Sequence, residues 1–203
     1  MNLVARSVLF YSIAGTCFAL NPESASAGVD ISIDGSASNF DMPLQNSKRS
    51  MISGSVDFDI GSHLRLGYTY RVDTMKSSGY KQDSASLQYY YQESQTNVNS
   101  NSVNLTLILY YGDLFVPFIQ AGAVVKDYYM IEKTGGVTYT IDPAKSPAQP
   151  SAGAGLHIVL SRSFNLKLSY TVSPGAKVAS PATSDKVTYV LDSTTSMGLV
   201  YKL

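Results

Sequence analysis

The chain has 203 residues, of which 15 are Lys or Arg, 15 are Asp or Glu, two are His and one is Cys. A formal net charge of zero argues against a nucleic-acid-binding protein, because such a protein needs a basic surface. A single cysteine excludes a small scaffold held together by internal disulfides. After the first 27 residues no stretch reaches 18 successive apolar side chains, so we expect no transmembrane helix there.

The N-terminal segment, residues 1–27, has the features of a secretory signal peptide. Arg6 supplies the basic start, and residues 8–20 form an apolar stretch that is too short to cross a bilayer as a helix. The small residues Ala25 and Ala27 match a cleavage site. We therefore predict a mature chain that begins at Gly28 and forms one domain over residues 28–203; a retained N-terminal anchor helix is the alternative.

Eight segments of the mature chain alternate between apolar and polar side chains with a period of two. This period is typical of β-strands, because successive side chains of a strand point to opposite faces. In chain order the predicted strands are 29–39, 50–60, 64–72, 103–111, 115–126, 152–160, 164–172 and 194–203. The sequence therefore predicts an all-β protein.

The connections between these strands alternate in length. Gly61-Ser62, Gly112-Asp113 and residues 161–163 form short turns, whereas the other links are polar and longer: 41–48, 73–101, 127–149 and 173–186. Short turns at one end and long loops at the other are typical of a transmembrane barrel. We predict an eight-stranded antiparallel up-and-down barrel. A ten-stranded barrel that uses a hairpin over 127–141, with Gly135-Gly136 at its tip, and a soluble β-barrel are the alternatives.

Charged side chains gather on one face of the predicted strands. If the apolar residues point outward, the outer face of the strand bodies has no charge, and ten ionisable groups point inward: Asp30, Asp34, Asp57, Asp59, Arg65, Arg71, Lys126, His157, Lys167 and Lys202. An eight-stranded barrel is only wide enough to be filled by its own side chains. We therefore predict that these groups form a paired lumenal charge network, and that Gly67, Gly153, Gly155 and Gly198 leave room for the long basic side chains. A metal or acid–base cluster of the four aspartates is less favoured, because basic residues are interleaved with them.

Two observations favour lipid rather than a soluble core as the neighbour of the apolar face. Each strand has about nine to eleven residues, the length that crosses a bilayer at a tilt. Tyrosines gather near the loop ends of the strands, as an interfacial girdle would require; these are Tyr68, Tyr70, Tyr128, Tyr129 and Tyr170.

The whole mature region resembles the small eight-stranded outer-membrane barrels of Gram-negative bacteria, of the opacity-protein and attachment-invasion type. The resemblance is carried by the leader, by residues 103–125, in which 115–122 is similar to the family's Pro-aromatic-x-x-Ala-Gly strand, and by the closing strand 194–203. It implies an outer-membrane location, contact with outer-membrane lipid, and recognition of the C-terminal strand by the barrel-assembly machinery. The chain departs from the family in ending on Leu203 instead of phenylalanine.

The resemblance leaves the function open among three classes. We expect a non-enzymatic surface or envelope protein whose long loops bind a host or surface ligand. The alternatives are a narrow pore for small solutes or ions, and a lipid-modifying enzyme that uses His157 and Ser161. The tyrosines at 89–91 are either an aromatic ligand patch or part of strands that extend beyond the membrane. We expect no cofactor, no metal site and no nucleic-acid partner.

Overall fold

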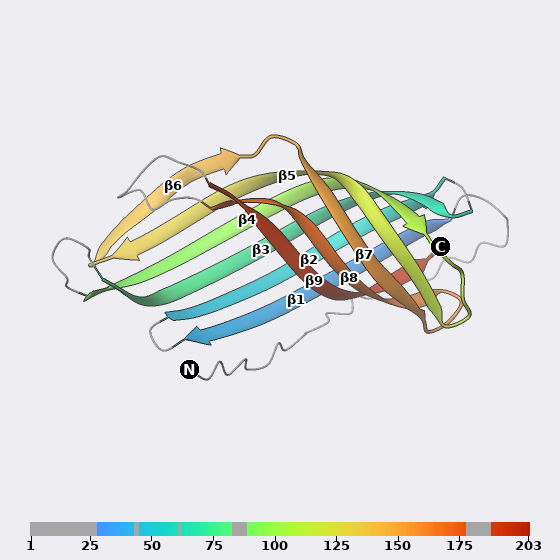
Figure 1. The fold of residues 1–203 in the computed structure, drawn as a ribbon, viewed down its shortest axis with the longest axis horizontal. Coiled ribbons are helices and arrows are strands. Elements are labelled where there is room, and N and C mark those ends of the chain that lie inside the picture. Colours follow the sequence, from blue (N-terminus) through green and yellow to red (C-terminus); the bar gives the residue numbers. More distant parts are fainter. Residues whose placement is uncertain (1–27, 43–44, 61, 83–88, 178–187) are drawn as a thin grey trace.

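A computed structural model describes residues 28–42, 45–60, 62–82, 89–177 and 188–203 (Figure 1). The predicted signal peptide, residues 1–27, lies outside the described residues. The strands are β1 (Val29–Met42), β2 (Gln45–Asp59), β3 (Leu64–Gln82), β4 (Tyr89–Ile108), β5 (Phe115–Thr134), β6 (Val137–Lys145), β7 (Gln149–Val159), β8 (Phe164–Lys177) and β9 (Thr188–Lys202). In the described residues, no helix has the length and hydropathy that crossing a membrane requires.

The nine strands make a closed barrel with eight positions in its wall. The order is β4-β3-β2-β1-β9-β8-β7-β5, and a β4–β5 pairing closes the circle. β6 shares one position with β7, because β7 pairs with residues 115–124 of β5 and β6 pairs with the remainder of that strand. The prediction of eight antiparallel strands is confirmed, and the ten-stranded alternative is wrong because the 127–141 hairpin lengthens existing strands.

The strands are longer than the sequence predicts at the end opposite the short turns. β3 and β4 continue through the predicted loop 73–101 until Gln82 pairs with Tyr89. Likewise β5 and β6 continue to the tip formed by Gly135 and Gly136, whose φ angles of 56° and 83° are those of a tight hairpin turn. We call these parts, residues 45–49, 73–82, 89–100, 127–134 and 137–145, the strand extensions; they project to one side in Figure 1.

The prediction of a loop over 73–101 is wrong for a physical reason. Within a membrane the outer face of a strand is apolar, and alternation is visible in the sequence. In the strand extensions both faces are polar, as with Gln92 and Ser94 on one face of β4 and Glu93 and Gln95 on the other, so the alternation disappears although the strand continues.

An apolar belt surrounds the barrel between its two ends. Its outward side chains are large and well exposed, and include Ile52, Phe58, Leu66, Tyr68, Tyr70, Val103, Leu105, Leu107, Ile119, Leu168 and Tyr170. The inner face is polar, with buried Asp30, Asp34 and Arg65. This arrangement is the inverse of a soluble barrel, whose apolar side chains point inward. We take the strand segments within the belt as the membrane-spanning segments.

One tyrosine of the predicted girdle lies on the inner face. Tyr68, Tyr70, Tyr129 and Tyr170 are exposed on the outer surface, whereas Tyr128 is buried. Neighbouring residues of a strand point to opposite faces, so Tyr128 and Tyr129 cannot both contact the membrane surface.

The seam between the first and last strands is the shortest ladder of the barrel wall. β1 and β9 pair from Asp30–Lys202 to Gly35–Met197, and Gly198 lies opposite Asp34 within this ladder. A Cβ atom at Gly198 would collide with the Ile33 carbonyl oxygen and lie 2.6 Å from the Asp34 Cα. Gly198 therefore permits the close approach of two backbones, and does not make room for a basic side chain as predicted. Gly67, Gly153 and Gly155 instead lie against the side chains of Asp57, Gln120 and Phe118.

Candidate functional site

Ionic side chains inside the barrel form three groups along its axis. The first lies near the short turns and joins β1, β2 and β3. The Arg65 guanidinium forms an ion pair with Asp30, and its Nε lies 2.7 Å from Asp59 Oδ1. Lys202 is opposite Asp30 in the β1–β9 ladder, and its Nζ lies 3.1 Å from the Asn165 amide oxygen when that amide is oriented to accept. Arg65 is therefore shared by two carboxylates.

The second group lies in the middle of the lumen. Lys167 Nζ on β8 is 3.4 Å from Asp34 Oδ2 on β1. The Ser32 hydroxyl donates to the same carboxylate at 3.2 Å, and Ser55 donates to Asp57 at 3.3 Å. Asp57 therefore has a hydroxyl donor, whereas Asp34 has both a donor and a cation.

The third group lies above the apolar belt, where the strand extensions begin. Arg49 Nε donates to Asp73 at 2.8 Å, and Arg49 Nη1 lies 3.1 Å from Asp192 Oδ1. Lys126 Nζ is 3.1 Å from the other oxygen of Asp192. Burial acts to raise the pKa of Asp192, but the charges of Arg49 and Lys126 outweigh burial and hold this pKa below its usual value. Asp192 therefore stays ionised. Through its ion pairs and that of Asp73, the third group joins β2, β3, β5 and β9.

Sequence reasoning missed Arg49, Asp73 and Asp192, because all three fall just outside the predicted strands. The signal that identifies Arg49 and Asp73 is parity, meaning whether a residue number is odd or even, because residues of one parity on a strand share a face. Arg49 has the same parity as the inward Met51, and Asp73 has the same parity as Arg71, so continuing the period of two by one step places both inside.

Acid should weaken the third group. Because the pKa of Asp192 is lowered from 3.8, its stabilising effect is complete above about pH 5 and is lost as the pH falls through the lowered value. We expect the thermal midpoint of the unaltered protein to fall between about pH 6 and pH 3, and to fall by more than that of the Asp192→Asn variant. Circular dichroism of the two proteins in detergent micelles measures the midpoints. Equal acid sensitivity of the two proteins would contradict this assignment.

His157 and Ser161 do not form a hydrolase pair. His157 is buried in the lumen, where its ring meets the edge of Phe118 at a centroid distance of 4.8 Å. The Ser161 hydroxyl accepts from the Phe164 backbone N–H at 3.1 Å and so closes the short turn. In the part of the chain that the structure describes, no hydrogen bond joins the two side chains, and no group of three His, Cys, Asp or Glu residues is placed to hold a metal.

The outer face of the strand extensions is hollowed into a groove of about 440 Å³, which we call the lysine groove. Its outward side chains come from four adjacent strands, namely Asn46, Lys48, Lys76, Ser78, Glu93, Gln95, Ile131 and Lys133. Lys48, Lys76, Glu93 and Lys133 are exposed. The groove begins beyond the apolar belt, so it opens to water beside the membrane and not to the lumen.

Among the described residues, none of the three lysines of this groove forms an ion pair, although Glu93 lies on the same face. Lys48 pairs directly with Lys76 across the β2–β3 ladder, and Lys133 pairs with Glu93 across the β4–β5 ladder. Among the described residues, no carboxylate oxygen lies within 4.0 Å of any of the three amines. Like charges placed directly opposite on neighbouring strands destabilise a sheet, so this face is built at a cost in stability.

No protein-family model matches the sequence, and no curated protein matches it. Among solved structures, the N-terminal β-barrel domain of Pseudomonas aeruginosa OprF is similar with a TM-score of 0.51 and 13% identity, over 88% of this chain and 100% of that chain. The Yersinia pestis attachment invasion locus protein Ail, in complex with the heparin analogue sucrose octasulfate, is similar with a TM-score of 0.53 and 13% identity, over 87% and 99% of the two chains. At this identity the likeness establishes the fold, which is that of a small outer-membrane β-barrel.

Proposed function

We propose that this chain is a non-enzymatic surface protein of the bacterial outer membrane, and that it binds a sulfated or phosphorylated glycan in the lysine groove. The observation that carries the proposal is the set of three exposed lysines around one hollow, with a single carboxylate among its outward side chains. In outer-membrane barrels the short turns face the periplasm, so the end that carries the strand extensions faces the outside of the cell. The groove is therefore accessible to surface glycans.

The electrostatics of the groove favour an anionic ligand. Sulfate or phosphate groups placed between Lys48 and Lys76 would offset the repulsion that the β2–β3 register imposes on them. Hydroxyl and amide groups of Ser78 and Gln95 lie beside the lysines and are suited to the neutral hydroxyls of a sugar. The complex of Ail with a heparin analogue supports this class of ligand, because that barrel has the same fold.

The lumen gives the pore and enzyme alternatives no specific support. The ion pairs of Arg65, Lys167 and Lys126 cross the interior of the barrel, and the cavity in its middle has a volume of only about 50 Å³. His157 packs against Phe118 and not against a nucleophile. The strand extensions, rather than the lumen, are therefore the proposed site of function.

Binding of the folded protein to immobilised heparin in detergent tests the proposal. We expect the Lys48→Gln/Lys76→Gln variant to bind at least about tenfold more weakly than the unaltered protein, and to elute at lower salt, because two charges that face the ligand are removed. Adding Lys133→Gln should weaken binding further.

A matched control removes two positive charges elsewhere. Lys145 lies at the end of β6 and Arg162 in a short turn, both exposed and both outside the groove. The Lys145→Gln/Arg162→Gln variant should bind heparin like the unaltered protein. If this control loses as much affinity as Lys48→Gln/Lys76→Gln, binding follows net charge and the groove is not the site.

A further inference from the structure

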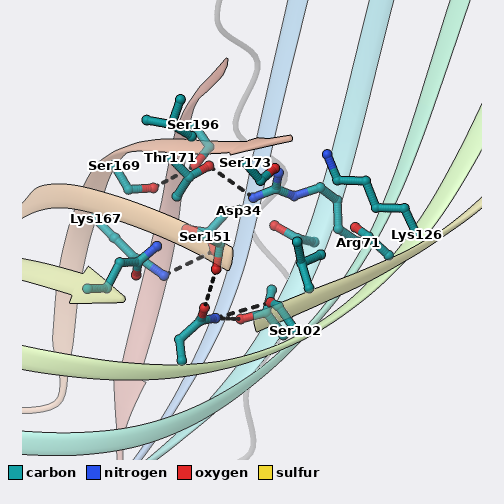
Figure 2. A pocket seen from close by; sticks show the side chains of 17 residues that line it. Asp34, Arg71, Ser102, Lys126, Ser151, Lys167, Ser169, Thr171, Ser173 and Ser196 are labelled. Carbon is teal, nitrogen blue, oxygen red and sulfur yellow. Dashed lines mark hydrogen bonds and ion pairs between the residues drawn. The ribbon is translucent and has the colours of Figure 1, made fainter. Parts of the chain in front are cut away.

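A second candidate site lies inside the barrel and does not depend on the function proposed above. It is a cavity of about 50 Å³ between the second and third groups of ionic side chains. Nine serine and threonine side chains line it, together with three cations, Arg71, Lys126 and Lys167, and one carboxylate, Asp34. Figure 2 shows Arg71 and Lys126 on one side of the cavity and Lys167 with Asp34 on the other.

The charges around this cavity do not balance. Lys167 is paired with Asp34, and Lys126 is paired with Asp192. Arg71 differs from both, because its hydrogen bond to the Thr171 hydroxyl, at 3.4 Å, joins it to a neutral partner (Figure 2). Within the described residues, no carboxylate oxygen lies within 4.0 Å of its guanidinium. Asp73, two residues along the same strand, is instead bound by Arg49.

An unpaired cation inside a barrel carries a large desolvation cost unless another charge compensates it. The guanidinium has five N–H donors, and most of them have no acceptor among the described side chains. The serine and threonine hydroxyls around it can also donate. The carboxylate that lines the cavity already binds Lys167. The cavity therefore presents a guanidinium whose N–H groups are largely free, hydroxyls that can turn to donate, and a single lining carboxylate that is already paired, which is chemistry suited to an anion.

We propose that this cavity binds a small monovalent inorganic anion, such as chloride, against the guanidinium of Arg71. A single water needs about 10–15 Å³ measured in the same way, so the cavity has room for one such anion with a few waters. It is too small for a nucleotide, a sugar or an organic acid. The anion gives Arg71 a charged partner within the cavity and acts as a removable part of the lumenal packing.

The thermal stability of the folded protein in chloride and in gluconate, at equal ionic strength, tests this proposal. Gluconate is too large for the cavity. We expect a saturable rise of the thermal midpoint by about 2–4 °C as chloride replaces gluconate, because the anion binds only the folded barrel. In Arg71→Met the rise should disappear, and this variant in gluconate should be at least as stable as the unaltered protein. Arg162→Met, in an exposed turn, should retain the full chloride response.

A crystal of the unaltered protein grown in sodium bromide provides a second test that does not depend on a variant that folds. We expect an anomalous difference peak next to the Arg71 guanidinium, since bromide replaces chloride. A chloride response that persists in Arg71→Met would overturn the proposal. A bromide crystal with no peak in this cavity would do so as well.

Discussion

Replacing Arg65 by methionine should destabilise the barrel by about 3–5 kcal/mol, the loss expected when one partner of a buried ion pair is removed. Arg65 joins two carboxylates, Asp30 and Asp59, and Asp30 is buried. Methionine keeps about the aliphatic stem of arginine and leaves these carboxylates with no cation in contact. The midpoint of urea unfolding in detergent micelles, followed by the mobility shift of the folded barrel on a gel, measures the loss.

The carboxylates provide the control for this experiment. If repulsion and desolvation of Asp30 and Asp59 cause the loss, then the triple variant Arg65→Met/Asp30→Asn/Asp59→Asn should recover much of it, since replacing a whole buried charge group by neutral residues is often close to neutral. A triple variant that is no more stable than Arg65→Met alone would show that the packing of the arginine side chain, and not its charge, is what matters.

Replacing Gly198 by valine should prevent stable closure of the barrel. A Cβ atom at this position would collide with the backbone of β1, which cannot move aside as a flexible side chain can. Overpacking usually costs about 1–3 kcal/mol, and we expect about 3 kcal/mol or more here because the clash lies in the shortest ladder of the wall. Loss of the compact, heat-modifiable gel band after refolding into detergent is the readout.

Gly54 offers a matched position for comparison. It lies on β2 within the apolar belt, and the nearest atom to a Cβ there is the Ser32 carbonyl oxygen at 3.9 Å. Gly54→Val should therefore fold like the unaltered protein, because its side chain points toward lipid. If both variants fold equally well, then the close approach of β1 and β9 at Gly198 does not limit closure.

The membrane-spanning part of the fold is predictable from the sequence because a bilayer imposes a strict period of two. The faces of Leu105, Leu107 and Arg65 follow from that period alone. The strand extensions are not predictable in this way, since they lie beyond the membrane, where the outer face can be polar like the inner face and no alternation is required. The tip at Gly135-Gly136 is the exception, because its residues specify a tight turn independently of hydropathy.

The partners of the charged side chains could not be derived from periodicity. Alternation shows that Arg65, Asp30 and Asp59 point inward, but which of them meet depends on the stagger between strands. Arg49 and Asp192 illustrate the difficulty, because they lie 143 residues apart and come from two strands on either side of β1. The same limit applies to the lysine groove, where the opposition of Lys48 and Lys76 follows from register and not from composition.

The short ladder between β1 and β9 also limits the immersion depth of the barrel. Beyond Gly35 and Met197, the described strands show no pairing between β1 and β9, so the peptide groups along these two facing edges depend on water or on other chain segments. Hydrocarbon cannot satisfy such groups. Gly35 is in register with Ile52 on β2, which is in register with Val72 on β3. Ile52 and Val72 are the last apolar residues on the outer face of these strands, because the next outward residues are Ser50 and Thr74. Backbone pairing and side-chain hydropathy thus set the same upper boundary for the acyl chains on this side of the molecule.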